Sequence, residues 1–333
     1  MMAHRHAGPV KRAGALGIVY VVWGSTYLAI AVADRTLPPF LMLSVRFLVA
    51  GALLWGWSVL RGEVAAERPG LRQWRAAAIV GGALLVLDTG GVAWAELRVS
   101  SGIAALIVAS VPLFMAILDR ACFGRRIPLG AALGIATGLL GVGLLVGPSG
   151  HVDPVGGVVL LAASFAWAAG SAYARVAPLP RAPFVSASMQ MLCAGAMLAV
   201  VGLARGERIS SVSTGSLLAV GFLVLFGSLV AFTAYGWLLA NVPTPLLSTY
   251  AYVNPGVAVF LGWALAGERV GGRELAAGLV ILASVAMIML AREAREHVQP
   301  VAEALPSYIR EQEARAAVVR SAPRLAELHR VAC

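Results

Sequence analysis

The chain of 333 residues repeats its own sequence at a spacing of 144 residues. The segment RFLVAGALL at 46–54 is echoed by QMLCAGAML at 190–198. Because the match runs along both halves, we expect the two halves to share one fold. Further matched elements are Trp23 with Trp167, Arg61-Gly62-Glu63 with Arg205-Gly206-Glu207 and, after a slip of one residue, Trp94 with Trp237 and Pro112 with Pro255.

The repeated unit is strongly apolar. Hydrophobic residues make up 59% of the chain and charged residues 13%, whereas soluble proteins carry about 25% charged residues. Charge-free stretches recur, and about 20 apolar residues suffice to cross a bilayer as a helix. A backbone in hydrocarbon has to satisfy its own hydrogen bonds, so such spans are helices. The sequence therefore predicts an all-α polytopic membrane protein, and a duplication in such a chain is typical of transporters.

We predict ten transmembrane helices, five in each repeat. They are expected at about 14–33, 39–60, 76–95, 101–119, 127–147, 155–175, 184–204, 215–238, 245–266 and 273–291. The first repeat is then 14–147 and the second 155–291, with a short segment at 1–13 and a polar tail at 292–333.

Arginine and lysine predict how the spans are oriented. If the N-terminus is cytoplasmic, the cytoplasmic loops carry twelve basic residues and the outer loops six, leaving the tail aside. Positive loops face the cytoplasm, so we expect both termini on the cytoplasmic side of a plasma membrane, the inner membrane in bacteria. Because five is an odd number, the two repeats are predicted to be inverted relative to one another.

The first span also imitates a cleavable signal peptide. Lys11-Arg12 precede an apolar run that ends in Ala31-Val32-Ala33. Yet the run is longer than an ordinary signal core, and it contains Trp23, which is matched at Trp167. We interpret it as the first span of the fold.

Several other classes of protein are not supported. The net charge of +10 comes from scattered loop residues, without the basic stripe of a nucleic-acid binder. The three cysteines and five histidines show no metal-ligand spacing, and no enzyme or nucleotide-binding motif is present. We therefore expect no catalytic residues, no metal and no cofactor, and no direct use of ATP.

The ordered motifs resemble those of the drug/metabolite transporter superfamily, specifically EamA-type transporters with two EamA repeats. The resemblance implies a secondary carrier with its site between inverted halves, which exports a small metabolite. It rests on Trp23-Gly24-Ser25-Thr26-Tyr27, Val45-Arg46-Phe47, Trp94-Ala95-Glu96, Ser100-Ser101-Gly102, Val111-Pro112, Tyr252-Val253-Asn254-Pro255 and Gly267-Glu268-Arg269. Two positions depart from the family pattern: Asp88, and Gly124-Arg125-Arg126 in place of the Gly-Glu-Arg turn.

Two charged residues fall inside predicted spans. Arg46 and Asp88 both lie seven residues from the outer ends of consecutive spans, about 10 Å deep at 1.5 Å per residue. Ionisable groups inside a membrane usually face a cavity or one another. One hypothesis is a pair that anchors substrate or responds to protons. The other is an ion pair that only joins two helices, or an arginine that snorkels to the outer interface. Their counterparts in the second repeat are Gln190 and Ala231, which favours a functional role.

Aromatic and amide residues are the other candidates for a substrate cavity. Trp23 and Tyr27 share one helix face, as do Tyr250 and Asn254. Trp94 and Trp167 are predicted to join them, although tryptophan also serves as a membrane-interface anchor. Such walls suit amphiphilic or amino-acid-like solutes.

Prolines and glycines predict how the helices bend and pack. Pro112 and Pro255 interrupt corresponding spans, and we predict that they act as hinges next to the site. The glycines at 130, 134, 138 and 141 have the spacing of close helix contacts, within the chain or in a homodimer.

The favoured hypothesis is a secondary transporter that exports an amino acid or related amphiphilic compound by alternating access, driven by the solute gradient or by protons through Asp88. One alternative is a membrane-embedded lipid-handling enzyme, but the loops show no cluster of carboxylates or histidines, and Glu96 reads as a solvated interfacial residue. Another alternative is a non-transporting scaffold whose tail recruits partners.

Overall fold

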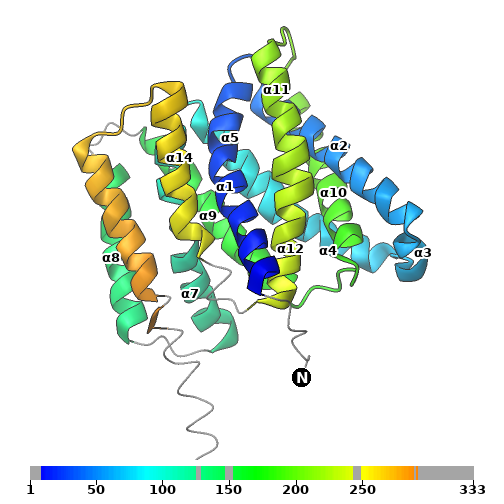
Figure 1. Ribbon diagram of the computed structural model, residues 1–333, viewed down its shortest axis with the longest axis horizontal. Coiled ribbons are helices and arrows are strands. Elements are labelled where there is room, and N and C mark those ends of the chain that lie inside the picture. Colours follow the sequence, from blue (N-terminus) through cyan, green and yellow to red (C-terminus); the bar gives the residue numbers. More distant parts are fainter. Residues whose placement is uncertain (1–8, 125–128, 147–152, 243–248, 289, 292–333) are drawn as a thin grey trace, which may run out of the picture.

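The computed structural model describes residues 9–124, 129–146, 153–242, 249–288 and 290–291. Over these residues it is a bundle of helices without strands (Figure 1). The predicted polar tail and most of the segment at 1–13 lie outside the described residues.

The helices follow the predicted order of spans. In the first half they are α1 (Pro9–Ala33), α2 (Pro39–Leu60), α3 (Glu63–Glu67), α4 (Leu71–Gly81), η1 (Gly82–Thr89), α5 (Gly90–Glu96), α6 (Ser101–Val108), α7 (Val111–Phe123) and α8 (Leu129–Val146). In the second half they are α9 (Pro154–Ala174), α10 (Pro183–Ala204), α11 (Thr214–Phe222), η2 (Leu223–Ala231), α12 (Phe232–Asn241) and α14 (Tyr250–Ala266), followed by a helix at 272–288.

Seven helical stretches among the described residues are long and apolar enough to cross a membrane. Apolar side chains such as Leu60 and Leu218 are exposed on the outside of the bundle, as expected where lipid takes the place of water. The three other predicted spans correspond to the shorter helices α8, α14 and 272–288. The protein is therefore an all-helical integral membrane protein.

The helices α2 and α10 begin and end in the same way. Each begins with a proline in its first turn, which suits a position where no backbone donor is needed. Each is followed by a glycine in the left-handed conformation, Gly62 at φ 71° and Gly206 at φ 76°, which ends a helix at no steric cost to glycine.

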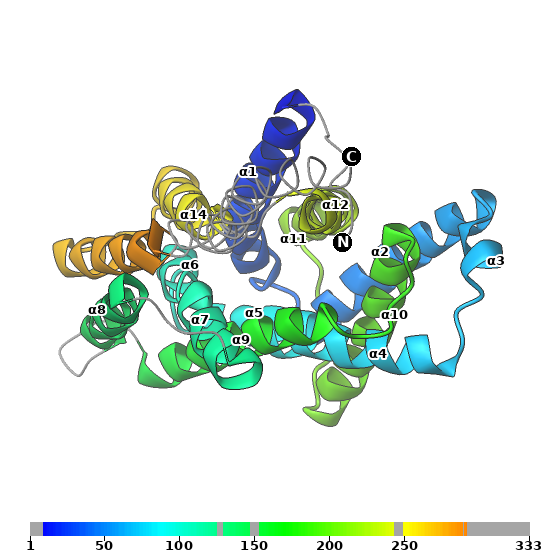
Figure 2. The same ribbon diagram turned by 90° about the horizontal axis from the view of Figure 1, so that it is seen from below.

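The same two helices pack against each other reciprocally. A Cβ atom added to Gly51 would lie 3.0 Å from Cγ of Leu192, and one added to Gly195 would lie 2.8 Å from Cγ of Leu48. Each glycine is the counterpart of the other at the 144-residue spacing, and so is each leucine. Contacts exchanged in this way are the pattern that a local two-fold axis produces. In Figure 2, α2 and α10 cross beside α4.

Three long spans are interrupted at their middle. The span from Leu71 to Glu96 contains the π-helix η1, and the span from Thr214 contains the π-helix η2. The fourth span is divided into α6 and α7 at 109–110, and Pro112 lies in the first turn of α7. Pro255 instead lies inside α14, which continues past it. π-helical turns occur often at functional sites.

The glycines of α8 pack inside the chain. Added Cβ atoms at Gly134 and Gly141 would meet Ile288 and Ile281 of the last helix at 2.8 and 2.9 Å. A Cβ added to Gly138 would meet Leu113 at 2.5 Å. The predicted close packing is therefore found between α8, α7 and 272–288, and a homodimer contact stays a prediction.

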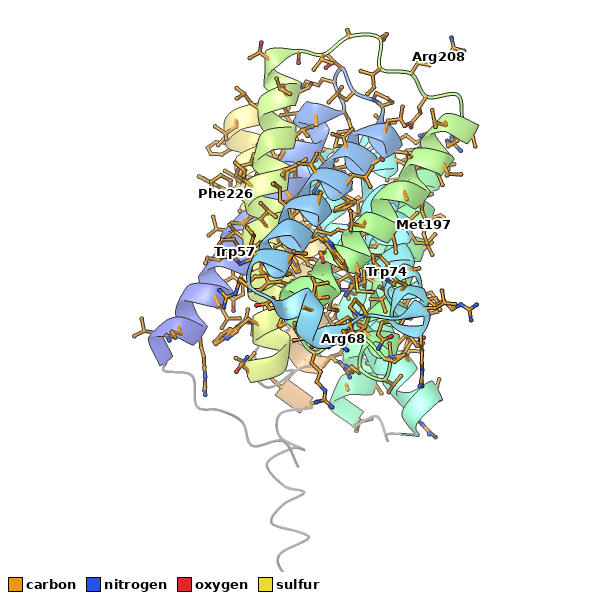
Figure 3. All side chains as sticks on the ribbon, turned by 90° about the vertical axis from the view of Figure 1, so that its right-hand side faces the viewer. Trp57, Arg68, Trp74, Met197, Arg208 and Phe226 are labelled. Atoms are coloured by element: carbon orange, nitrogen blue, oxygen red, sulfur yellow. The ribbon has the colours of Figure 1, made fainter. Side chains whose placement is uncertain are left out.

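Carboxylates cap the first turns of helices from the other half. Glu207 accepts the backbone N–H groups of Phe40 and Leu41 at the start of α2, and Glu268 accepts those of Ser101 and Gly102 at the start of α6. Backbone donors at a helix start have no partner within the helix, and the helix dipole favours negative charge there. Figure 3 shows Arg208 at one end of the bundle, far from Arg68.

Candidate functional site

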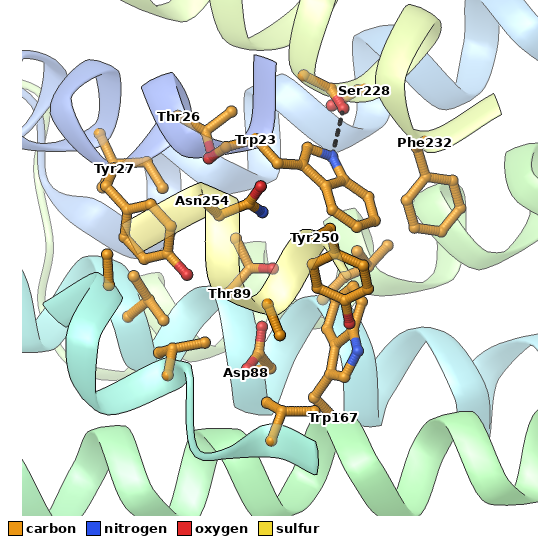
Figure 4. Close-up of a pocket in the computed structure, with 18 of the residues that line it drawn as sticks. Trp23, Thr26, Tyr27, Asp88, Thr89, Trp167, Ser228, Phe232, Tyr250 and Asn254 are labelled. Atoms are coloured by element: carbon orange, nitrogen blue, oxygen red, sulfur yellow. Dashed lines mark hydrogen bonds between the residues drawn. The ribbon is translucent and has the colours of Figure 1, made fainter. Parts of the chain in front are cut away.

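A cavity of about 100 Å³ lies in the middle of the bundle, between residues of both halves. The first half contributes residues of α1, α2, η1, α5, α6 and α7, and the second half contributes residues of α9, α10, η2, α12 and α14 (Figure 4). By the measure in which a water molecule needs about 10–15 Å³, the cavity has room for roughly seven to ten water-sized groups. Its size suits a small metabolite.

Seven of the eight predicted cavity residues line this space. They are Trp23, Tyr27, Arg46, Asp88, Trp167, Tyr250 and Asn254. Pro255, one of the two predicted hinges, also lines it, whereas Pro112 follows the lining residue Val111 without lining the cavity itself. Whether these residues bind a substrate stays a prediction.

Trp94 lies outside the cavity. Its ring is covered by the guanidinium of Arg98, whose Cζ lies 3.9 Å from the ring centroid. This cation–π contact resembles the interface anchors of membrane proteins. The repeat of tryptophans at matched positions therefore did not identify which of them faces the centre.

One wall of the cavity is aromatic. The ring of Trp23 lies 5.7 Å from that of Trp167 and 5.6 Å from that of Tyr250, both nearly perpendicular, and 4.9 Å from that of Tyr235. Edge-to-face pairs of this kind are favourable beyond the area they bury. Trp23, Trp167 and Tyr250 line the cavity from α1, α9 and α14, and Tyr235 of α12 packs against Trp23 without lining it.

Arg46 enters the cavity from α2 and is only 5% exposed. Its Nε donates a hydrogen bond to Oγ of Ser228 at 3.0 Å, and its Cζ lies 4.9 Å from the ring centroid of Phe47. The Nη1 atom is buried and has no hydrogen-bond partner. Ser228 thus fixes the guanidinium, and Nη1 remains available for an anion.

Asp88 enters from η1 and is 6% exposed. Its Oδ1 atom is buried without a hydrogen-bond partner, and no ion pair joins it to Arg46. The predicted Arg46–Asp88 pair is therefore two separate ionisable groups on one cavity. In Figure 4, Asp88 and Ser228, which holds Arg46, lie on opposite sides of the space.

Asn254 joins α14 to α1. In the orientation of its amide that satisfies both partners, the side-chain nitrogen donates to the backbone oxygens of Tyr250 and Tyr20, each at 3.2 Å. The two helices approach closely at Gly24, where an added Cβ would lie 2.6 Å from Cβ of Val257. Asn254 therefore lines the cavity and also joins two helices of its wall, and Gly24 allows those helices to approach closely.

The sequence did not single out several lining residues. Their shared property is that they are small, hydroxylated or apolar, which makes them ordinary in an apolar helix. They are Thr26, Phe47, Thr89, Met191, Gly227, Ser228 and Phe232. The one usable signal for Thr26 was its place between Trp23 and Tyr27 in the first motif.

A second polar cluster lies at one end of the bundle. It consists of Asp34, Glu96, Glu207 and Glu268, and we call this the carboxylate end. Glu207 and Glu268 cap helices, but the carboxyl oxygens of Asp34 and Glu96 are buried and have no hydrogen-bond partner. Burial, and then the neighbouring charge of Glu207, raises the pKa of Asp34 to about 8.

The structure corrects two expectations from the sequence. Carboxylates do gather at one end of the bundle, and the carboxyl oxygens of Glu96 are buried rather than solvated. None of the described residues forms a group that could hold a metal ion.

Long apolar helices that enclose a small cavity, lined from both sequence halves and carrying buried charges, define the class of membrane transporters. The comparison with known proteins narrows this class. The chain belongs to the EamA-like transporter family, whose model matches residues 13–147 and 155–290.

Individual relatives cover most of the chain. The uncharacterized inner membrane transporter YedA of Escherichia coli (strain K12) is 41% identical over 277 residues, which are 82% of this chain and 89% of that protein. A probable amino-acid metabolite efflux pump of Salmonella typhimurium is 23% identical, over 80% of this chain and 91% of that protein. A probable terminal-alkyne amino-acid exporter of Streptantibioticus cattleyicolor is 25% identical, over 84% and 93% respectively.

The fold also matches a solved crystal structure. That protein is 21% identical and aligns with a TM-score of 0.63 over 86% of this chain and 99% of its own. At this identity the match concerns the fold alone.

Proposed function

We propose that this protein is a secondary transporter that exports a small metabolite, an amino acid or a related amphiphilic compound, across the bacterial inner membrane. The observation that carries the proposal is the central cavity, where Arg46 and Asp88 each keep a buried polar atom without a partner. Unpaired groups in a low-dielectric interior are costly, so they are retained where a ligand completes them. The names of the two more distant relatives, an efflux pump and an exporter of amino acids, support the same class of solute.

Transport is proposed to occur by alternating access of two inverted five-helix repeats, with both termini in the cytoplasm. The reciprocal packing of α2 and α10 supports this symmetry, as do the two π-helices, since η1 at a spacing of 143 residues falls on 225–232 and overlaps η2. Pro112 and Pro255 are the proposed hinges, because one follows a break between helices and the other removes a backbone donor beside the cavity.

Efflux from proteoliposomes tests the proposal. Vesicles with the purified protein are preloaded with a mixed panel of amino acids and other metabolites, and release is followed with and without a pH gradient. Protein-dependent release of amino acids is the expected result. Faster release in the presence of the pH gradient would identify protons as the energy source. Vesicles without protein give the leak rate. Release at the leak rate for every amino acid, from protein that elutes as a folded species, would contradict the proposed function.

A further inference from the structure

Among the lining residues, buried polar atoms without a partner belong to Arg46, Asp88 and Trp167, and the first two are ionisable groups of opposite sign. Arginine is always protonated and can only donate hydrogen bonds, so the free Nη1 of Arg46 requires an anion or a neutral acceptor. The free Oδ1 of Asp88 requires a donor, best a cation. The cavity therefore has an anion-binding side and a cation-binding side.

The two sides are held apart by the structure. Arg46 is fixed by its bond to Ser228 on η2, and Asp88 is carried by η1. Figure 4 shows Ser228 and Asp88 on opposite sides of the cavity. Because the two charges do not neutralise one another directly, a ligand between them can contact both.

Among the described residues, the second half contributes no charged side chain to the lining of the cavity. The counterpart of Arg46 is Gln190, whose side-chain nitrogen is occupied by Oγ of Ser186 at 3.1 Å, and the counterpart of Asp88 is Ala231. A charged ligand therefore has one preferred orientation in the cavity rather than two.

Taken with the proposed function, on which it rests, this arrangement leads to a specific ligand. We propose that the cavity binds an amino acid as a zwitterion, with its carboxylate on Arg46, its ammonium group on Asp88 and its apolar side chain against the ring of Trp23. A zwitterion completes both buried charges at once, whereas an amine leaves Arg46 unpaired and a carboxylic acid leaves Asp88 unpaired. Leaving a buried charged group unpaired is expected to weaken binding at least tenfold, which corresponds to about 1.4 kcal/mol or more.

Matched ligands and two variants test the proposal. Leucine, which has nine non-hydrogen atoms and so matches roughly the room in the cavity, is compared with isopentylamine, which lacks the carboxylate, and 4-methylpentanoate, which lacks the ammonium group. Binding to the full-length protein in nanodiscs at pH 7 is measured through competition with radiolabelled leucine and through quenching of tryptophan fluorescence.

The wild-type protein is expected to bind leucine at least tenfold more tightly than either analogue. Asp88→Asn is expected to weaken the binding of leucine, so that 4-methylpentanoate binds as well as leucine or better. Arg46→Gln is also expected to weaken the binding of leucine, so that isopentylamine binds as well as leucine or better. The matched control is Arg61→Gln, on the exposed end of the same helix as Arg46, which keeps the wild-type order.

A general loss of folding cannot produce two opposite changes of preference. Variants that lose all three ligands in parallel, or that keep the wild-type order, would overturn the proposed contacts. Efflux of other solutes by a wild-type protein that does not bind leucine would overturn the zwitterion proposal and leave the transport function standing. Binding in the expected order without any efflux would overturn the transport function and leave the binding site standing.

Discussion

Gly227 controls the position of the buried guanidinium of Arg46. A Cβ atom added there would lie 3.0 Å from Nη2 of Arg46 and 3.1 Å from Cγ2 of Thr26. Such a contact is tighter than normal packing, so a methyl group would push the guanidinium away from Ser228. The geometry of the site therefore requires a residue without a Cβ atom at position 227.

We expect Gly227→Ala to weaken binding of leucine at least tenfold, since displacing a charge-assisted contact costs about 1.5–3 kcal/mol. The control is Gly221→Ala, where an added Cβ has nothing within 4 Å. Competition binding in nanodiscs measures both. Equal affinities of the two variants would show that the site does not depend on this glycine.

Asp34 makes the stability of the protein depend on pH. Its folded pKa of about 8 lies above the value of about 3.9 for an unfolded chain. Between these values the folded state retains a proton that the unfolded state has released, so stability falls as pH rises from about 4 to about 8. The groups that face Asp34 are Glu207 and Glu96, both acidic.

Asp34→Asn is expected to remove this part of the pH dependence. At pH 8 the variant should unfold a few degrees higher than the wild type, since about 1 kcal/mol moves the midpoint by roughly 2–4 °C in a mid-sized protein. At pH 4 the two midpoints should coincide. Thermal unfolding in detergent measures this, with Glu63→Gln, whose partner Arg61 is 55% exposed, as the control. A constant difference at both pH values would contradict the assignment.

Single residues also mark where prediction from sequence ends. Arg46 and Asp88 were predictable because a charge in an apolar span is conspicuous. Ser228 and Gly227 were not, because small residues are common in apolar helices and nothing in their spacing shows which side faces Arg46. Trp94 was misplaced because a tryptophan near a helix end serves equally as cavity wall or interface anchor, and its neighbour Arg98 decides the matter.

At the scale of elements, proline and glycine made helix ends predictable and the π-helices were unpredictable. The predicted span 39–60 agrees with α2, because Pro39 fits a first turn and Gly62 ends the helix. A π-helical turn adds a residue to an otherwise helical ladder. The apolar sequences of η1 and η2 fit an α-helix equally well, so only the packing of neighbouring helices reveals the change.

The crossing of α2 and α10 depends on two glycines that leave no space. We expect Gly195→Ala to lower the free energy of unfolding by about 1–3 kcal/mol, because its Cβ would meet Cγ of Leu48 at 2.8 Å and a backbone nitrogen at 3.0 Å. Gly56→Ala, on the exposed face of α2, is the control and should be neutral or stabilising by up to about 1 kcal/mol. Chemical denaturation in micelles compares them, and a neutral Gly195→Ala would contradict the tight crossing.

For the whole molecule, inversion of the repeats predicts that corresponding residues lie on opposite sides of the membrane. Arg61 and Arg205 end α2 and α10 and are both exposed. In a background without Cys122, Cys193 and Cys333, Arg205→Cys should react with an impermeant maleimide in intact cells. Arg61→Cys should react only in inside-out vesicles. Labelling of both from the same side would exclude inverted repeats.

The cap that Glu268 places on α6 has a consequence for the energies of the two access states. A carrier with identical inverted halves would hold both states at equal free energy, because exchanging the halves converts one state into the other. Glu268 accepts three hydrogen bonds from Ser101 and Gly102, whereas the residue at the matching position is Arg125, which has no acceptor. The two access states therefore differ in free energy. Each 1.4 kcal/mol of this difference shifts the ratio of their populations in the empty carrier tenfold. This position of a duplicated motif is thus one source of the difference in free energy that sets on which side an unloaded carrier rests.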